Sequence, residues 1–245
     1  MKTPLIFDIK RSSTVDGPGI RTAVFFKGCN LDCFWCHNPE GKSPLRVTAL
    51  FKEKCICCGV CATAEDPVRY CPAQARRIYG NEYGMDELVE IIRADKPYYD
   101  ATGGGVTFTG GECMLYPEFL SELAKGCREA GISVAVDTAG NVPFESFERV
   151  LPYTDLFLYD IKALDSALHR KGTGVDNGMI LENLEKLRKR DANILVRIPS
   201  IPDFNEDETD KIKRYCQDRS LPYELLPYHA SGESKRRAIE ENEKL

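Results

Sequence analysis

Six short apolar segments rich in β-branched and aromatic residues recur along the chain, and helical patterns separate them. The expected strands cover residues 21–27, 106–108, 132–136, 156–159, 194–198 and 223–226. The helical patterns cover 85–94, 117–130, 144–151, 178–190 and 207–219. This alternation indicates right-handed βαβ units on a parallel sheet, and six such units can curl into an incomplete barrel. We therefore expect an α/β fold whose functional loops follow the C-terminal ends of the strands.

One segment interrupts the alternation. Residues 46–83 show no regular period but hold five cysteines, which predicts a small insert folded around metal. The barrel then comprises residues 1–45 and 84–245, and a length of 245 residues suits one large domain with such an insert. The polar tail, 231–245, is expected to form a frayed helix or to be disordered.

Charge and cysteine content narrow the class of protein. The formal net charge is -5, and no Lys/Arg run exceeds the three residues 235–237, which argues against a nucleic-acid or anionic-membrane partner. Only a four-residue apolar stretch precedes Asp8, and no 18-residue apolar run occurs, so we expect a soluble, cytoplasmic protein. Eleven cysteines in a reducing compartment indicate metal binding or chemistry rather than disulfides.

Three of these cysteines, Cys29, Cys33 and Cys36, lie on one short loop directly after the first expected strand. Three thiolates can hold three irons of a [4Fe–4S] cluster and leave the fourth iron free to bind a substrate or cofactor. The alternative is a structural zinc site in which His37 is the fourth ligand. The loop alone leaves both open.

The CxxxCxxC spacing resembles the signature of radical S-adenosylmethionine (SAM) enzymes. Further motifs resemble, in order, those of the activating enzymes of glycyl radical enzymes, the group that includes pyruvate formate-lyase activating enzyme. They are STVDGPGIR at 13–21, GGGVTFTGGE at 103–112, DTAG at 137–140, YDIK at 159–162, RIPSIPDFN at 197–205 and LLPYH at 225–229. The resemblance spans about residues 5–230 and implies a partial (β/α)6 radical SAM barrel with a ferredoxin-like insert.

The resemblance also implies a SAM pocket at the strand ends. Gly110 and Gly111 allow a close backbone approach and Glu112 offers an acceptor, so this segment is assigned to the amino group of SAM, although a Gly-Gly pair alone can be a simple turn. Other residues placed in this pocket are Trp35 near the adenine, His37, and the donors Lys162, Arg197 and His229. The simpler interpretation is core packing for Trp35 and a solvated or salt-bridged surface side chain for Lys162, Arg197 and His229, with a core histidine as a further possibility for His229.

Two further sites follow from the resemblance. Asp137, Thr138 and Asp160 are expected to hold a monovalent cation near the SAM carboxylate, although an acidic residue after a strand is as often a helix N-cap. Asp16 is expected to face the glycine-bearing loop of the partner, on the catalytic side of the site, unless it only shapes its turn.

The insert cysteines resemble a bacterial ferredoxin run. Cys55, Cys58 and Cys61 have its spacing, but the next ligand, Cys71, follows after nine residues where the run has three. We expect one auxiliary [4Fe–4S] cluster on these four residues, with Cys57 left over and a Cys₄ zinc site as the alternative. The remaining cysteines, Cys113, Cys127 and Cys216, are expected in the core.

The predicted function is that of an oxidoreductase, a radical SAM activating enzyme (EC 1.97.1.-) that works anaerobically. Reductive cleavage of SAM at the Cys29/Cys33/Cys36 cluster would give a 5′-deoxyadenosyl radical, which abstracts a Cα hydrogen from a glycine of a partner glycyl radical enzyme. A flavodoxin or ferredoxin would supply electrons. The alternatives are a radical SAM enzyme acting on a small molecule or another macromolecule, and a non-catalytic ferredoxin-like or zinc-scaffold protein.

Overall fold

The computed structural model describes residues 2–243 and shows one curved sheet of seven strands in the order β1-β2-β5-β6-β7-β8-β9. All neighbours from β2 to β9 pair in parallel, whereas β1 pairs antiparallel with β2. The strands are β1 (Ile6–Ser13), β2 (Arg21–Phe26), β5 (Gly105–Gly110), β6 (Ser133–Thr138), β7 (Leu156–Asp160), β8 (Ile194–Ser200) and β9 (Tyr223–Pro227). Because β1 and β9 are not paired with each other, this sheet is an open barrel wall.

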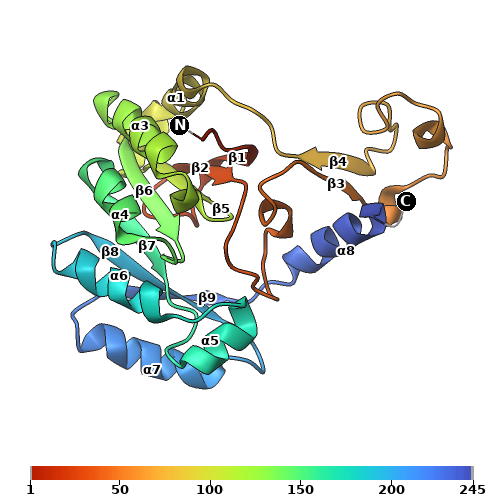
Figure 1. Cartoon of the computed structure of the whole chain (residues 1–245). Helices are drawn as coiled ribbons and strands as arrows, with labels where there is room; N and C mark the ends of the chain where they lie inside the picture. Colours follow the sequence, from red (N-terminus) through yellow and green to blue (C-terminus); the bar gives the residue numbers. More distant parts are fainter. Residues whose placement is uncertain (1, 244–245) are drawn as a thin grey trace.

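The helices that connect the parallel strands line the outside of the curved sheet (Figure 1). They are α1 (Met85–Arg93), α2 (Lys96–Thr102), α3 (Pro117–Glu129), α4 (Phe144–Val150), α5 (Ser166–Thr173), α6 (Gly178–Arg188) and α7 (Glu206–Gln217). All six expected strands and all five expected helices are present, and Pro117 occupies the first turn of α3 as its fixed φ favours. The structure adds β1, α2 and α5, which the sequence patterns did not indicate.

Successive strand residues face opposite sides of the sheet, and the two sides differ in chemistry. The outward positions, among them Val24, Phe108, Val136 and Val196, join the main hydrophobic core with the helices. The alternate positions include the polar residues Thr107, Thr109, Asp137, Asp160 and Arg197, whose mutual contacts are described below. The core therefore lies between sheet and helices, and the polar strand positions gather on the inner face.

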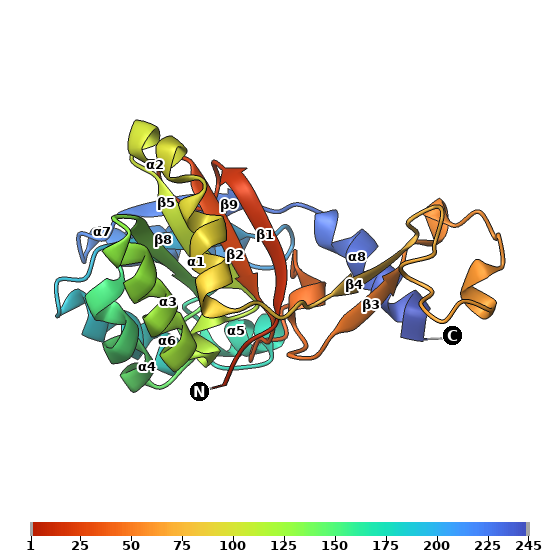
Figure 2. The ribbon, with the colours of Figure 1, turned by 90° about the horizontal axis from the view of Figure 1, so that it is seen from above.

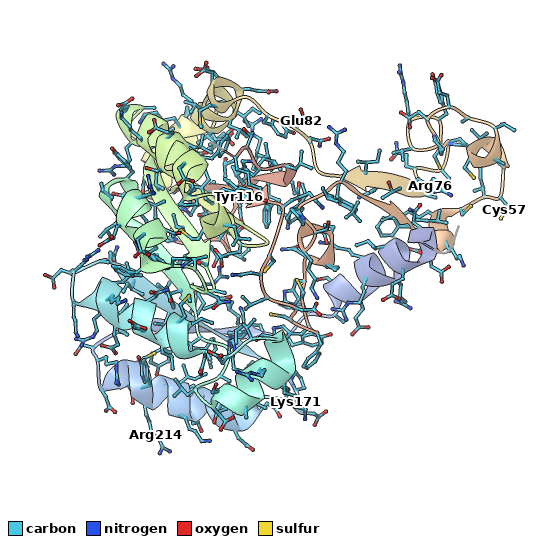
Figure 3. All side chains as sticks on the ribbon, in the orientation of Figure 1. Cys57, Arg76, Glu82, Tyr116, Lys171 and Arg214 are labelled. Atoms are coloured by element: carbon cyan, nitrogen blue, oxygen red, sulfur yellow. The ribbon has the colours of Figure 1, made fainter. Side chains whose placement is uncertain are left out.

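The cysteine-rich segment contains a small antiparallel sheet of β3 (Val47–Leu50) and β4 (Arg76–Tyr79), which its sequence, without a regular period, did not indicate. The pair projects away from the barrel, and the chain between the two strands forms the outermost part of the molecule (Figure 2). Figure 3 shows Cys57 in this outer part and Arg76 on β4. The boundaries at 46 and 83 stay a prediction.

The polar tail forms helix α8 (Ser231–Glu243), which lies beside β3 and between the barrel and the outer part of the insert (Figure 1). Its Ala238 is buried with Ala49 and Phe51, so tertiary contacts hold a segment that has little helix-forming amphipathicity of its own. Met1, Lys244 and Leu245, which the expected domain and tail ranges include, lie outside the described residues. No helix in the described part of the chain is long and apolar enough to cross a membrane.

Candidate active site at the strand ends

The loop that carries Cys29, Cys33 and Cys36 begins where β2 ends. Gly28 has a φ of 97°, a conformation that glycine adopts without strain. The backbone N–H groups of Gly28 and Cys29 donate to the carbonyls of Gly41 and Lys42, at 2.8 and 2.9 Å. Backbone hydrogen bonds therefore fix the start of the loop.

Helix α5 fixes the middle of the same loop. The N–H groups of Asp32 and Phe34 donate to the carbonyls of Thr173 and Gly172, at 2.7 and 3.2 Å. These two carbonyls belong to the last turn of α5, whose C-terminal carbonyls have no partners within the helix. The loop thus provides hydrogen-bond donors for the C-terminal carbonyls of α5, and these bonds position the cysteine loop relative to α5.

The three thiols lie near one another and are largely enclosed. Burial raises the pKa of Cys29 to about 12, with further contributions from Glu112 and the other two cysteines. Burial likewise raises the pKa of Cys33 to about 11 and raises that of Cys36. The N–H of Leu31 donates to Cys29 Sγ at 3.4 Å, the kind of N–H···S contact that stabilises a ligating thiolate.

Among the described residues, no three His, Cys, Asp or Glu side chains converge tightly enough to hold a single metal ion. The thiols of Cys29, Cys33 and Cys36 lie close enough to one another to raise one another's pKa. A cubane cluster binds each thiolate through a separate iron, so its ligands surround the cluster. An enclosed group of three cysteines on one fixed loop fits such a cluster.

The glycine pair at the end of β5 packs directly against the end of β2 and the start of this loop. A Cβ at Gly110, whose φ is 121°, would lie 2.3 Å from the backbone nitrogen of Phe26. A Cβ at Gly111 would lie 2.2 Å from the carbonyl oxygen of Gly28. Close backbone packing alone thus requires glycine at both positions, and the predicted contact with SAM stays a prediction.

Glu112 joins the loops after β5 and β6. Its carboxylate accepts hydrogen bonds from Met114 N at 3.1 Å, Thr138 Oγ1 at 2.8 Å and Ala139 N at 2.9 Å. Complete burial raises the pKa of Glu112 to about 7, although these three donors oppose the shift. Thr138 also accepts from Gly140 N, so its hydroxyl is part of the same network.

Asp137 and Arg197 form an enclosed ion pair on the inner face. Arg197 Nη1 lies 3.3 Å from Asp137 Oδ2, which also accepts from Thr109 Oγ1 at 2.7 Å. Burial raises the pKa of Asp137 to about 6, against the opposing effect of Arg197. Arg197 Nε lies 3.3 Å from Glu224 Oε1, yet it makes no hydrogen bond of good geometry with described residues.

Lys162 and Asp160 form a second ion pair beside the first. Lys162 Nζ donates to Asp160 Oδ2 at 2.6 Å, while the buried Asp160 Oδ1 has no hydrogen-bond partner among the described residues. Burial opposes the charge of Lys162, but Asp160 and Cys33 outweigh it and raise the pKa of Lys162. The ammonium group is therefore positive and lies close to the cysteine loop.

Trp35 lies within an aromatic cluster at the end of the cysteine loop. Its ring centroid is 4.8 Å from that of Phe34 and 5.0 Å from that of Phe204. Gly172 supplies the space, because a Cβ there would lie 2.4 Å from Phe204 Cζ and 2.6 Å from Trp35 Cζ3. Trp35 is buried, and its predicted proximity to adenine stays a prediction.

His37 and His229 come together from opposite parts of the sequence. The backbone N–H of His229 donates to His37 Nε2 at 3.4 Å, and the rings lie 6.0 Å apart. Burial, with nearby His229 and Lys235, lowers the pKa of His37. Because Nε2 accepts this bond, His37 is assigned as neutral with its proton on Nδ1. His229 is exposed and is not a core histidine.

Asp16 lies in the loop between β1 and β2. Its Oδ2 accepts from Ser13 Oγ at 2.5 Å, and its carbonyl accepts from Thr107 Oγ1 at 2.6 Å. The buried Arg21 also donates to Thr107, at 2.7 Å, and to Val106 O at 2.6 Å. Asp16 contributes to the raised pKa of Asp137, which places its charge toward the inner face of the sheet.

The insert cysteines are more open than those of the first loop. Cys55, Cys57, Cys58 and Cys61 are exposed, and Cys71 is half-buried. Cys71 Sγ accepts from Ala75 N at 3.3 Å. Desolvation is the largest single effect on its pKa and raises it, but the backbone N–H groups of residues 73, 75 and 76 and the charge of Arg76 together outweigh it and lower the pKa. Its surroundings therefore favour a thiolate.

Several residues of the site were not anticipated from the sequence. Phe204 and Asn205 lie within the quoted motif at 197–205, so the signal was present but only Arg197 was singled out. Asn205 is buried and donates to the carbonyls of Lys162 and Pro199, at 2.7 and 2.8 Å. Thr109, whose hydroxyl binds Asp137, lies in the motif at 103–112.

The fold and the cysteine loop define a class of enzymes, and comparisons with known proteins agree with it. The profile of the radical SAM superfamily matches residues 23–216. A structure of Streptococcus suis SuiB bound to precursor peptide SuiA is similar in fold, with a TM-score of 0.59 at 15% identity over 86% of this chain and 39% of that chain. A structure of native anSMEcpe with bound AdoMet gives a TM-score of 0.54 at 16% identity, over 82% of this chain and 50% of that chain.

Curated relatives are closer in sequence. The (2S)-3-sulfopropanediol dehydratase activating enzyme of Klebsiella oxytoca is 36% identical over 96% of this chain and 85% of the relative. The trans-4-hydroxy-L-proline dehydratase activating enzyme of Clostridioides difficile is 38% identical over 95% of this chain and 86% of the relative. The chain belongs to the activating enzymes of glycyl radical enzymes within the radical SAM superfamily.

Family membership confirms the predicted fold class and the enzyme class of the chain. It is a radical SAM oxidoreductase, with SAM and a [4Fe–4S] cluster as the cofactors of the family and a glycyl radical enzyme as its protein partner. The non-catalytic alternatives and the small-molecule alternative have no support from these relatives.

Proposed function

We propose that Cys29, Cys33 and Cys36 hold the catalytic [4Fe–4S] cluster and that SAM binds over the adjoining strand ends. The observation that carries this proposal is the set of three mutually close, enclosed thiols on a loop fixed by hydrogen bonds from two sides. When bound, the cluster supplies the electron for reductive cleavage of SAM, and the resulting radical abstracts hydrogen from glycine.

Different residues around this loop are assigned to the carboxylate, the ammonium group and the adenine of SAM. Lys162 and Arg197 are enclosed cations on the inner face and suit the carboxylate of SAM. Glu112 accepts three hydrogen bonds that fix its position, and a carboxylate has a further acceptor site, so we assign Glu112 and the adjoining Gly110–Gly111 turn to the ammonium group of SAM. Trp35 and its aromatic neighbours offer an apolar wall for the adenine.

The same inner face suggests where the partner is recognised and where a cation binds. Asp16 lies on the loop between β1 and β2, beside the open side of the sheet, and is our candidate contact for the glycine-bearing loop.

Asp160 Oδ1 is a buried oxygen without a described donor, which supports a monovalent cation between Asp160 and Asp137.

Substitution of Cys33 tests the catalytic site. Cys33→Ala leaves two thiolates, and we expect it to abolish formation of 5′-deoxyadenosine from SAM under reducing, anaerobic conditions. Cys127→Ala removes a buried thiol from α3 and serves as the matched control. Glycyl radical formation in a partner enzyme is read by electron paramagnetic resonance. Undiminished SAM cleavage in Cys33→Ala would refute the assignment.

We also propose one auxiliary [4Fe–4S] cluster on Cys55, Cys58, Cys61 and Cys71, fed by a flavodoxin or ferredoxin in the cytoplasm. The N–H groups around Cys71 Sγ support its role as a thiolate ligand. The exposure of the other three cysteines suits a cluster that receives electrons at the surface.

Iron, sulfide and zinc counts on anaerobically prepared protein test the auxiliary cluster. Cys71→Ala should lose the iron of one cluster, whereas Cys57→Ala, an exposed cysteine of the same segment, should keep it. Zinc in place of the second cluster's iron would overturn this part of the proposal and leave the catalytic site untouched.

A further inference from the structure

Helix α8 contacts both cysteine-bearing parts of the molecule. At its first turn, Gly232 lies so close to the catalytic cysteine loop that a Cβ there would be 2.2 Å from the carbonyl oxygen of Cys36. At its other half, Ala238 is buried with Ala49 and Phe51 of the insert. Figure 2 shows the helix extending from the barrel along β3 and β4.

The barrel end of α8 is fastened by Lys235. Its Nζ donates to His37 O at 3.2 Å, Asn38 Oδ1 at 3.1 Å and Glu40 Oε1 at 2.5 Å. The side chain of Glu40 is only 3% exposed, and its Oε2 has no described hydrogen-bond partner. In residues 2–243 Lys235 is the only cation that forms an ion pair with this carboxylate, although the buried Lys27 lies nearby and donates to the carbonyl of Glu40. Loss of the Lys235 contact would therefore leave a buried carboxylate without its ion pair.

A further hydrogen bond holds the barrel end of α8, because Arg236 donates to the carbonyl of Phe34 at 2.5 Å.

The insert end of α8 is held by polar contacts as well as by the packing of Ala238. Arg76 of β4, labelled in Figure 3, donates to Asn242 Oδ1 at 2.7 Å. Lys52 forms an ion pair with Glu241. One continuous helix therefore joins the turn after Cys36 to both strands of the insert.

We propose that α8 is a strut that sets the position of the insert relative to the catalytic cysteine loop, with Gly232 and Lys235 as its positioning residues. A helix is stiff along its axis, so an anchor at each end holds the two segments at a constant separation. Electron transfer between two clusters depends on that separation, and this functional consequence rests on the auxiliary cluster proposed above.

Hydrogen–deuterium exchange on the cluster-free full chain tests the strut without any cofactor. Lys235→Met should accelerate amide exchange about tenfold in the cysteine loop, 29–38, and equally in β3 and β4, which contain none of the polar partners of Lys235 among the described residues. Lys235→Arg, which keeps a cation for Glu40, should restore slow exchange. Arg237→Met removes an exposed cation from the same helix and should change neither segment.

Gly232→Ala provides a second route if Lys235→Met folds poorly, because the added methyl group pushes α8 from the cysteine loop. Faster exchange confined to the cysteine loop, with β3 and β4 unchanged, would overturn the strut. In iron-loaded protein, Lys235→Met should weaken the magnetic interaction between the two reduced clusters at unchanged iron content. A second cluster missing from the wild type would instead sink the auxiliary-cluster proposal, while the exchange result would still decide the strut.

Discussion

At the scale of single residues, Gly172 shows how the site depends on an absent side chain. It lies in the last turn of α5, where its carbonyl holds the cysteine loop and its missing Cβ leaves space for Trp35 and Phe204. Neither its place in a polar helix nor its neighbours in sequence indicate this role. The requirement arises only when three distant segments pack together.

Gly172→Ala should destabilise the cluster-free protein by about 1–3 kcal/mol, because the methyl group overlaps two rings that are already packed. Trp35 is the only tryptophan, so its emission should shift as well. Urea unfolding and fluorescence measure the two effects. Gly178→Ala is the control, since a Cβ there meets nothing closer than 3.4 Å. Equal stability of both variants would contradict the packing argument.

His169 gives a prediction about pH. It is buried, and its Nδ1 lies 2.7 Å from the carbonyl of Val175, so this nitrogen carries the proton of a neutral ring. Burial lowers the pKa of His169 below its usual 6.5. Below pH 6.5 the unfolded chain then binds a proton that the native chain does not, and stability falls as the pH falls, by at most about 1.4 kcal/mol per pH unit.

Unfolding of cluster-free protein between pH 7.5 and pH 5.5 measures this slope. His169→Gln cannot titrate and should lose the part of the slope that His169 contributes. His37, whose pKa is also lowered, acts in the same direction, whereas Glu112 and Asp137, whose pKa values are raised to about 7 and about 6, stabilise the native state as the pH falls and oppose it. His229→Gln replaces an exposed histidine that helps to lower the pKa of His37, so it should change only the contribution of His37 and leave that of His169. A slope that is identical in all three proteins would rule out a buried neutral His169.

At the scale of elements, sequence patterns located the parallel strands because those strands are continuous apolar runs. They did not indicate the edge strand β1, because its exposed residues Asp8, Lys10 and Arg11 interrupt the apolar pattern. They also left α8 uncertain, since its strongest contact, Lys235 with Glu40, spans 195 positions. Local periodicity cannot report a segment that long-range contacts stabilise.

Asn205 ties the ends of neighbouring elements together, and its loss should be costly. Its side chain donates to Lys162 O and Pro199 O and accepts from Ile201 N at 2.7 Å. Asn205→Ala leaves these buried groups without partners and should destabilise the cluster-free protein by about 2–4 kcal/mol. Asn193→Ala removes one exposed bond, to Asp155 O, and should cost less than about 0.5 kcal/mol. Urea unfolding compares them, and equal losses would contradict the argument.

At the scale of the whole molecule, polar residues that the family motifs single out gather on one inner face, and the alternation of the sheet explains why. Asp137, Asp160 and Arg197 occupy inner positions of adjacent strands, so a parallel register brings them together. The apolar content of these strands alone does not show which of their residues face the inner side of the sheet and which face the hydrophobic core. Local sequence patterns do not show that the sheet is open between β1 and β9. Whether a barrel closes depends on the number of strands in the whole sheet.

The last prediction concerns the edge of this open side, where we expect the partner enzyme to make contact. Leu225 on the edge strand β9 is 45% exposed, and an exposed apolar side chain beside the proposed entrance suits contact with an incoming protein loop. Leu225→Lys should raise KM for the glycyl radical enzyme about five- to tenfold, the loss of roughly 1–1.4 kcal/mol of contact, while SAM cleavage without partner stays unchanged. Met179→Lys alters a residue of similar exposure, 44%, on α6 and should change neither rate. Equal effects of the two substitutions would show that the partner does not approach along β9.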